Sequence, residues 1–394
     1  MPNLVVLSHL RWDFVFQRPQ HLMSRFAQTG NVLFIEEPVH KPGDPGYTVS
    51  HPCTNVTVIK PHTPLQNPGF EGKQTAVLAP VIEEVVQQMA PEDYCAWFYT
   101  PMALPLLDAL KPQAVIYDCM DELSAFAYAP PQLKRRERAL LKRADLVFTG
   151  GPSLYRAKRS HNPATHCFPS AVDTRHFSRG ADRANVLPSL AGIAKPRLGF
   201  FGVVDERFDC ELLATIAAMR PDWQFCIVGP VVKIDPSLLP RRANIHYFGQ
   251  QPYADLPGFI AGWDVCLLLF AQNDATRFIS PTKTLEYMAA ARPVVSTPVV
   301  DVVDLYGDLV SIARSPEEFV SACEALLAET ADERILREAA MRRKVETLTW
   351  DNTAKAMAAV IAETVVAKRA QPNIFGSRGV LQAPLATPAR TPAQ

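Results

Sequence analysis

A lysine and a glutamate one helical turn apart are the residues of this 394-residue chain that point most directly to chemistry. Lys283 and Glu286 follow Ser280 and Pro281, which suit a helix start because serine is a good N-cap and proline favours the first helical position. The free N–H groups of such a start, at Thr282 and beyond, can hold a pyrophosphate together with the Lys283 ammonium. Glu286 can then accept hydrogen bonds from two ribose hydroxyls. The alternative is an ordinary capped helix with a solvated glutamate.

Two aspartates, Asp118 and Asp121, follow an apolar run that is typical of a buried strand. A carboxylate in the mouth of a cleft has its pKa raised by partial burial and can take a proton from an attacking hydroxyl. If the chemistry needs a general base, one of the two can serve, and Asp121 is our first choice. The alternative is that they cap a helix beginning near Glu122.

Short, continuous apolar runs alternate with helical patterns and supply the elements that must position these side chains. Such runs suit parallel strands covered on both faces by helices. The predicted strands are 4–7, 32–35, 96–99, 114–117 and 146–149, and then 198–201, 225–228, 245–248, 265–269, 294–296 and 309–312. Two doubly wound, Rossmann-like α/β domains facing each other across a cleft are the simplest architecture.

The two sets of strands are separated by a polar segment that is broken by glycine and proline. We predict a first domain in 1–178, a linker in 179–196 and a second domain in 197–349. A last helix, 350–368, can cross back to the first domain, and the tail 369–394 has the composition of a disordered segment. Open sheets bind ligands outside the carboxyl ends of their strands, so we expect the site between the domains.

Composition excludes several classes of function. The 40 basic and 40 acidic residues balance, so no global field would attract nucleic acid. The eight cysteines lack zinc spacing and CxxC pairs, which indicates a reducing cytosol. The first apolar run falls short of the roughly 7 to 15 residues of a signal peptide. We therefore expect a cytoplasmic protein. The sequence has no Asp-x-Asp triplet, and we expect the protein to bind no metal.

The segment Ser280–Pro298 resembles the donor-binding helix of family-four GT-B glycosyltransferases, also called glycosyl transferases group 1. The usual pattern has two glutamates eight positions apart, then a helix of small residues and a Pro-Val-Val strand. Glu286 matches the second glutamate and Pro293–Val295 the strand, but Phe278 stands at the position of the first glutamate. The pattern Pro-x-Lys-x-x-Glu-Tyr fits an exopolysaccharide-associated subgroup better.

Two further stretches resemble the nucleotide-sugar site of the same family. The first strand of the second domain and the turn after it resemble the place where a basic residue meets the phosphates, and Arg207 is the candidate, with Gly202 beside it. A guanidinium can grip two phosphate oxygens, and glycine lets the backbone approach the ligand. The alternative is a surface arginine paired with Asp205 or Asp209. The stretch around Gly249 resembles the segment that holds the nucleotide base.

In the first domain, polar and aromatic side chains fill the loop after the first strand, where a glycine-rich turn is usual. The loop resembles the Gln-Arg-Pro-Gln-His signature of the same exopolysaccharide-associated subgroup. His9, Arg11, Gln17 and Arg18 are therefore candidates for contact with an acceptor or a phosphate, and His9 is also a catalytic candidate. The alternative for each is a solvated loop residue. His21, inside the following helix, is expected to be packed.

The resemblance implies transfer of a hexose from a nucleoside diphosphate sugar to a glycan or lipid-linked acceptor, in cell-surface or exopolysaccharide synthesis. The first domain would face the acceptor and the second would bind the donor. Retention of configuration is favoured over inversion, and then a donor phosphate oxygen can replace an enzyme base. The donor is a co-substrate and no cofactor is expected, because Arg207, Lys283 and the helix dipole can stabilise the departing diphosphate. The alternatives are a GT-B sugar-nucleotide epimerase and a non-catalytic GT-B scaffold of a polysaccharide assembly.

A basic run, Lys134–Arg143, carries six lysines and arginines on a predicted helix. It can rest on anionic lipid headgroups and so hold the protein at the inner face of the membrane. A solvated basic face is the favoured alternative.

Overall fold

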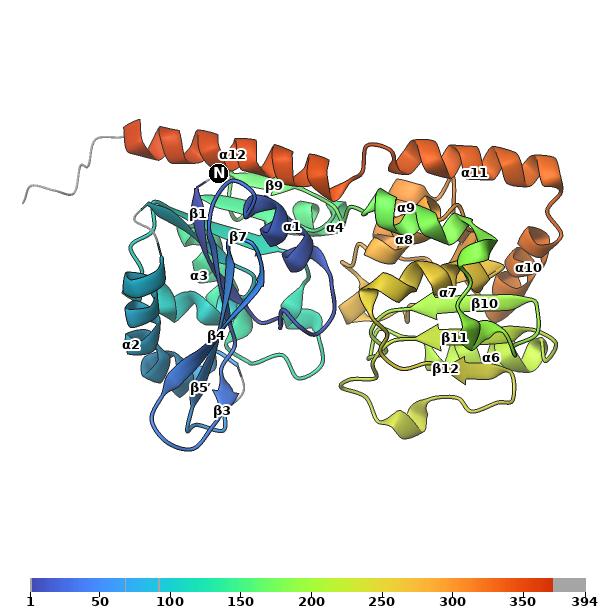
Figure 1. Cartoon of the computed structure of the whole chain (residues 1–394), viewed down its shortest axis with the longest axis horizontal. Coiled ribbons are helices and arrows are strands. Elements are labelled where there is room, and N and C mark those ends of the chain that lie inside the picture. The colour runs from blue at the N-terminus through green and yellow to red at the C-terminus, as the bar shows by residue number, and fades with distance from the viewer. Residues whose placement is uncertain (1, 68, 91–92, 371–394) are drawn as a thin grey trace, which may run out of the picture.

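The computed structural model describes residues 2–67, 69–90 and 93–370, which form two lobes side by side (Figure 1). Each lobe is built on one largely parallel sheet with helices on its faces. Two apolar clusters pack against the two faces of each sheet, which explains why the strands are continuous apolar runs. The predicted pair of Rossmann-like domains facing each other is confirmed.

The sheet of the first domain has the strand order β3-β5-β2-β1-β6-β7-β8-β9, and β4 pairs antiparallel with β5. The strands are β1 (Asn3–Ser8), β2 (Val32–Glu36), β3 (Val39–His40), β4 (Gly46–Cys53), β5 (Val56–Thr63), β6 (Tyr94–Phe98), β7 (Ala114–Cys119), β8 (Leu146–Thr149) and β9 (Thr165–Cys167). The five predicted strands are present. The unpredicted strands, β3 to β5 and β9, are short, exposed or interrupted by polar residues, so they lack a continuous apolar run.

The sheet of the second domain has the order β12-β11-β10-β13-β14-β15. Its strands are β10 (Arg197–Phe201), β11 (Gln224–Val228), β12 (Ile245–Tyr247), β13 (Val265–Leu268), β14 (Val294–Ser296) and β15 (Ser311–Ile312). This is the order of the dinucleotide-binding fold, in which the direction of winding reverses between the first strand and the fourth. Here the reversal falls between β10 and β13, so the expected binding crevice lies beyond their carboxyl ends.

Helices connect the strands. The α-helices are α1 (Arg18–Phe26), α2 (Gly72–Met89), α3 (Leu133–Arg143), α4 (Pro152–Lys158), α5 (Thr174–Phe177), α6 (Cys210–Met219), α7 (Leu256–Gly262), α8 (Thr282–Ala289), α9 (Val300–Tyr306), α10 (Pro316–Leu327), α11 (Ala331–Val345) and α12 (Trp350–Ala370). The 3-10 turns are η1 (Pro101–Ala109), η2 (Leu123–Ala125), η3 (Ser178–Ala181), η4 (Arg183–Asn185), η5 (Pro188–Leu190), η6 (Pro236–Leu238), η7 (Tyr253–Asp255) and η8 (Asp274–Thr276). The helix expected near Glu122 is only the short turn η2. Glu122 is its N-cap residue, but its side chain makes no capping hydrogen bond.

The segment predicted as a linker, 179–196, lies against the second domain. Arg183 donates hydrogen bonds to the carbonyls of Ala261 at 2.9 Å and Trp263 at 2.8 Å. Leu190 is fully buried in the core of that domain. The segment is therefore packed on the second domain and is not a free connection.

Helix α12 returns to the first domain and runs along it (Figure 1). Trp350 is fully buried and its ring stacks on His21 with centroids 4.8 Å apart. Met357 and Ile361 join the same first-domain core, so the packing predicted for His21 is confirmed. Residues 369 and 370 end α12, whereas the rest of the predicted tail, 371–394, lies outside the described residues.

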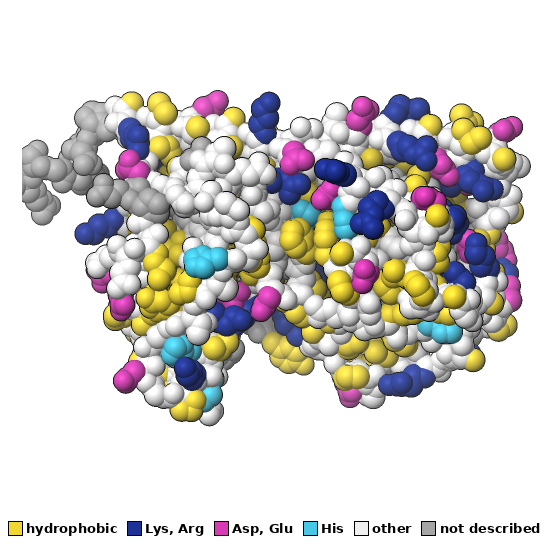
Figure 2. All heavy atoms as spheres, in the orientation of Figure 1, with side chains coloured by type: hydrophobic (Ala, Val, Ile, Leu, Met, Phe, Trp, Pro, Cys, Tyr) yellow, Lys and Arg dark blue, Asp and Glu magenta, His cyan; other side chains and the backbone are white. Residues whose placement is uncertain are grey.

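The surface carries charges of both signs. Figure 2 shows basic and acidic side chains interspersed over both lobes on the face in view, in keeping with the balanced composition. Among the residues that the structure describes, no helix is both long and apolar enough to span a membrane.

Candidate functional site

A pocket of about 630 Å³ opens between the two domains, a volume in the range of small-molecule sites. It lies at the carboxyl ends of β1, β7 and β8 in one sheet and of β10, β11 and β13 in the other. Its walls are 12–18, Met120, Asp121, Gly150 and Ser170 of the first domain, and 201–203, Arg207, 228–230, 250–253, Leu256, Phe270, 279–283 and Glu286 of the second. The expected place of the site is therefore where the cavity is found.

Helix α8 supplies one wall of the pocket, and its start differs from the prediction. The helix begins at Thr282, Pro281 is its N-cap, and Ser280 lies one residue outside. Pro281 has an extended backbone (ψ 117°), so the chain turns into the helix one residue later than expected. The carbonyl of Ser280 instead accepts a hydrogen bond from the Ser170 hydroxyl at 2.8 Å, across the domain boundary. Ser280 and Thr282 both line the pocket.

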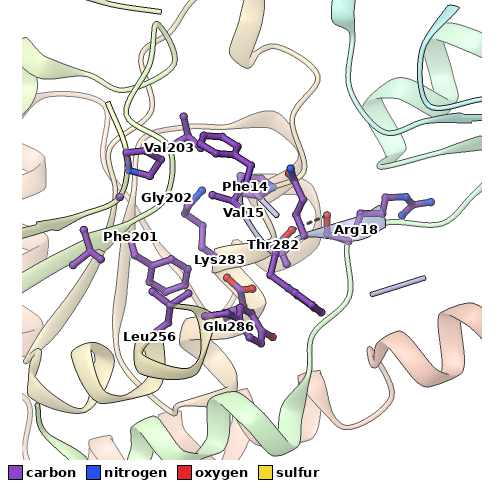
Figure 3. Close-up of a pocket in the computed structure, with 18 of the residues that line it drawn as sticks. Phe14, Val15, Arg18, Phe201, Gly202, Val203, Leu256, Thr282, Lys283 and Glu286 are labelled. Carbon is purple, nitrogen blue, oxygen red and sulfur yellow. Dashed lines mark hydrogen bonds between the residues drawn. The ribbon is translucent and has the colours of Figure 1, made fainter. Parts of the chain in front are cut away.

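Lys283 and Glu286 project from α8 into the pocket, with Gly202 on one side and Phe14 of the first domain on the other (Figure 3). The Lys283 ammonium lies 5.3 Å from the centre of the Phe270 ring. Burial raises the pKa of Glu286, whose side chain is only 6% exposed, and lowers the pKa of Lys283. Within the described residues, neither head group has a hydrogen-bond or ion-pair partner. A ligand with phosphate and hydroxyl groups can satisfy both.

Gly202 adopts a left-handed φ of +141° at the end of β10, a conformation that favours glycine. A Cβ added there would lie 2.5 Å from Cε of Lys283, so the missing side chain leaves room for the lysine. Gly249 also has a positive φ, of +65°. Its neighbours Gln250 to Tyr253 line the pocket, whereas Gly249 supports them by accepting a hydrogen bond from the Gly229 amide at 2.7 Å. Gly249, the residue named for this segment, is thus not a wall of the pocket, but the residues that follow it are.

Arg207 is both paired and directed at the pocket. Its guanidinium binds the Asp205 carboxylate through two nitrogens, at 3.0 Å and 2.6 Å, and lies 5.1 Å from the centre of the Phe126 ring. The pairing that was the alternative interpretation is thus present, but Arg207 also lines the pocket. Burial raises the pKa of Asp121 to about 6, and the nearby Arg207 opposes that rise. Of the two carboxylates predicted as a base, Asp121 lines this pocket, as Arg207 does.

Arg18 and Asp118, predicted as separate cleft residues, bind each other. Nε and Nη2 of Arg18 contact the carboxylate of Asp118 at 3.0 Å and 2.9 Å, and Nη1 donates to the carbonyl of Phe168 at 2.8 Å. Both side chains are buried, and that of Arg18 extends away from Lys283 and Glu286 (Figure 3). Buried charges require such pairing. Asp118 is therefore not at the cleft mouth, and its ion pair occupies the groups that catalysis or acceptor binding would need.

His9 and Arg11 are not among the residues that line the pocket. Burial, with a smaller effect of Lys233, lowers the pKa of His9 to about 4, so its ring is neutral at pH 7. Arg11 binds the Glu36 carboxylate at 3.1 Å and the Glu37 carbonyl, at the end of β2. Gln17 does line the pocket, at the start of α1. Of the loop candidates that sequence reasoning named, only Gln17 and Arg18 are among its walls.

Two aromatic residues of the same loop were not predicted as site residues. Phe14 and Phe16 line the pocket although they are 36% and 43% exposed. The Gln250 side-chain amide donates to the Phe14 carbonyl at 2.5 Å, and the Phe16 ring lies 4.7 Å from that of Tyr253. The loop thus spans both domains. Large apolar residues within a polar loop were the sequence signal for it.

No three His, Cys, Asp or Glu side chains in the described part of the chain gather closely enough to hold a metal ion.

Comparison with known proteins agrees with this geometry. A family model described as glycosyl transferase-like matches residues 207–359. The chain is 26% identical over 297 residues to a putative teichuronic acid biosynthesis glycosyltransferase of Bacillus subtilis, TuaH, covering 70% of this chain and 73% of that protein.

Solved structures share the fold at low identity. Sucrose-phosphate synthase from Thermosynechococcus elongatus superimposes with a TM-score of 0.69 at 16% identity, over 93% of this chain and 100% of that one. An E. coli trehalose-6-phosphate protein bound with UDP-2-fluoro glucose gives 0.68 at 12% identity, over 92% and 99%. The family match, the curated relative and the shared fold support the resemblance drawn from the motifs, and the chain has the fold of GT-B glycosyltransferases.

Proposed function

We propose that the chain transfers a hexose from a nucleoside diphosphate sugar, with retention of configuration, to a glycan or lipid-linked acceptor in cell-surface polysaccharide synthesis. The observation that carries the proposal is the position of Lys283 and Glu286 in the crevice beyond β10 and β13, where the winding of the sheet reverses. Within the described residues, neither side chain has a hydrogen-bond or ion-pair partner, and Glu286 is buried. The relative named for teichuronic acid biosynthesis supports the polysaccharide context. The neighbour that was bound with UDP-2-fluoro glucose supports a nucleotide-sugar donor.

The donor's diphosphate would lie between the Lys283 ammonium, the Arg207 guanidinium and the first N–H groups of α8. Asp205 fixes the Arg207 fork, so little conformational entropy is lost when a phosphate binds. Glu286 would accept hydrogen bonds from the ribose hydroxyls. These fixed charges would stabilise the departing diphosphate without a metal, since they face the place where negative charge develops.

Under retention, a phosphate oxygen of the donor would take the proton of the acceptor hydroxyl. The paired state of Asp118 supports this, because its carboxylate is already committed to Arg18. Asp121 would then influence the site through its charge beside Arg207, not as a base. The eight cysteines are free thiols, which supports a reducing, cytoplasmic location.

The proposal is tested by a thermal-shift panel of UDP, GDP, ADP and their sugars. A nucleotide that binds the folded state raises the melting temperature by mass action. We expect one nucleotide to do so, UDP being the first to try, and Glu286→Ala to abolish the shift. Glu346→Ala, at an exposed glutamate outside the pocket, is the matched control and should keep it. A wild type that responds to no nucleotide would refute the proposal.

The stereochemical part is tested separately once the donor is known. NMR of the product should show the donor's anomeric configuration, and Asp121→Asn should keep both turnover and donor binding. Complete loss of turnover in Asp121→Asn with donor binding intact would instead support inversion with Asp121 as the base.

A further inference from the structure

A second cavity, of about 430 Å³, lies between the two domains. Helices α3 and α4 and the segment after β7 form its first-domain side, and η8 with the residues after it forms the second-domain side. Neither the family match nor the proposed donor site assigns a ligand to it.

The second cavity adjoins the donor pocket along both of its walls. In the first domain, Asp121 lines the donor pocket and the next residue, Glu122, lines the second cavity. In the second domain, Ile279 lines the donor pocket and Phe278, the residue before it, lines the second cavity. An acceptor that places its hydroxyl near Asp121 would therefore extend toward this cavity.

The charges of the second cavity favour an anion. Lys134, Arg138 and Arg277 line it with exposed side chains, and within the described residues no carboxylate lies at ion-pair distance from any of them. Lys158 bridges the half-buried Glu122 and the buried Glu137 at 2.6 Å and 2.8 Å. With Lys158 included, the four basic side chains of the lining outnumber its three carboxylates, those of Glu122, Glu137 and Asp274.

The rest of the lining contains one further carboxylate, apolar side chains, Ser124 and His161. Asp274 is the exposed acid of the cavity, while Phe278 and Leu141 provide an apolar surface. An aromatic face with cations at its rim suits a sugar ring that bears a negative group, since the ring's C–H face can pack on Phe278 while its anion meets the arginines.

We propose that this second cavity binds a carboxylate or phosphate carried by a sugar of the acceptor, so that the acceptor is an acidic glycan. The inference rests on the proposed transferase function and names its acceptor class. Phe278, which stands where the related enzymes carry a glutamate, then serves the acceptor side of the groove.

The test is a ligand-observed NMR titration with glucose 6-phosphate, glucuronate and glucose, in the presence of the nucleotide found by the thermal-shift panel. We expect at least one anionic sugar to bind more tightly than glucose, and the phosphate and carboxylate probes to separate the two anion types. Arg138→Glu combined with Arg277→Glu should remove the preference. Asp274→Asn should strengthen binding about 3-fold, since it removes the one exposed negative charge.

Two controls make the test specific. Arg135→Glu changes an exposed charge on the same helix outside the cavity and should keep the preference. The arginine double variant should keep the nucleotide-induced thermal shift. If nucleotide binds but the anionic sugars bind no better than glucose, the inference fails while the proposed function stands; if no nucleotide binds, the proposed function fails first.

A lipid role for the same helix would give a different result. Arg135→Glu and Arg138→Glu would then weaken binding to phosphatidylglycerol vesicles equally. The protein would also bind the anionic sugars no more tightly than glucose. That outcome would overturn the acidic-glycan inference.

Discussion

At the scale of single residues, the buried pair of Arg18 and Asp118 is where interpretation of the sequence is most clearly corrected. Arg18→Met would leave the Asp118 carboxylate buried without its partner, which costs about 3–5 kcal/mol. We expect urea denaturation to show a loss of that size. The double variant Arg18→Met with Asp118→Leu should lose less, because it removes both charges.

The same variants separate a structural role from a ligand-binding one. If Arg18 stabilises the fold alone, the folded fraction of Arg18→Met should bind nucleotide with unchanged affinity in calorimetry. A tenfold weaker nucleotide affinity of Arg18→Met at equal folded fraction would show that Arg18 contributes to nucleotide binding.

Asp121 makes stability depend on pH in a direction that can be worked out. Burial raises its pKa from the usual value near 3.8 to about 6, so the native state holds this proton more tightly than the unfolded chain. The stabilisation is complete below pH 3.8 and is lost as pH rises through 6. Asp121→Asn should therefore raise the melting temperature at pH 7.5, by a free energy on the order of 1–3 kcal/mol, and have little effect at pH 4.5.

Melting curves at the two pH values decide this point. Equal gains at both would show that the amide improves packing instead. A loss at pH 7.5 would show that attraction between Asp121 and Arg207 outweighs burial.

At the scale of elements, the end of β10 and the start of α8 depend on each other through one glycine. Gly202→Ala would strain a left-handed backbone, at a cost of about 1–3 kcal/mol, and would push against Lys283. We expect nucleotide affinity to fall at least tenfold. Gly192→Ala, where an added Cβ meets nothing within 4 Å, is the matched control and should be near neutral.

A double variant identifies the cause of the effect. Because the contact is with the flexible end of Lys283, Lys283→Ala should recover part of the stability lost in Gly202→Ala. Strictly additive losses would place the whole cost in the backbone of Gly202.

The elements that sequence could predict are those defined by local patterns. The continuous apolar runs gave the central strands of both sheets, and the spacing of Lys283 and Glu286 placed both on one face of a helix that lines the pocket. Strand β5 was missed because its polar and proline residues interrupt the run, although it pairs with β2 in the interior of the sheet. A local sequence pattern does not indicate which strands will pair.

The same limit applies to pairs of site residues. Arg18 and Asp118 are separated by 100 positions, and each has the sequence context of a cleft residue at the end of a strand or the start of a helix. Only the tertiary fold brings the start of α1 and the end of β7 together, so that the two side chains meet. Likewise, the cavity role of Phe14 depends on Gln250 of the other domain, which no local spacing could indicate.

At the scale of the whole molecule, the last helix ties the end of the chain to the domain in which it began. Trp350 is fully buried in the first-domain core and stacks on His21, so Trp350→Ala should cost about 3–5 kcal/mol. Because these contacts are with the first domain, local unfolding should appear in that domain. The sheet of the second domain should be unaffected, although it is nearer to α12 along the sequence. Hydrogen exchange followed by mass spectrometry should show faster exchange in α1 and β1, with β10 and β13 unchanged.

Val366→Ala provides the control for this experiment, since Val366 lies on the same helix with a side chain 67% exposed and should leave exchange unchanged in both domains. Faster exchange in β10 and β13 of Trp350→Ala would mean that α12 supports the second domain, or that the two domains unfold as one unit. In the expected case, the donor pocket would lose its first-domain wall before its second-domain wall. Nucleotide binding, which depends mainly on α8 and Arg207, would then survive in Trp350→Ala at temperatures where turnover has already been lost.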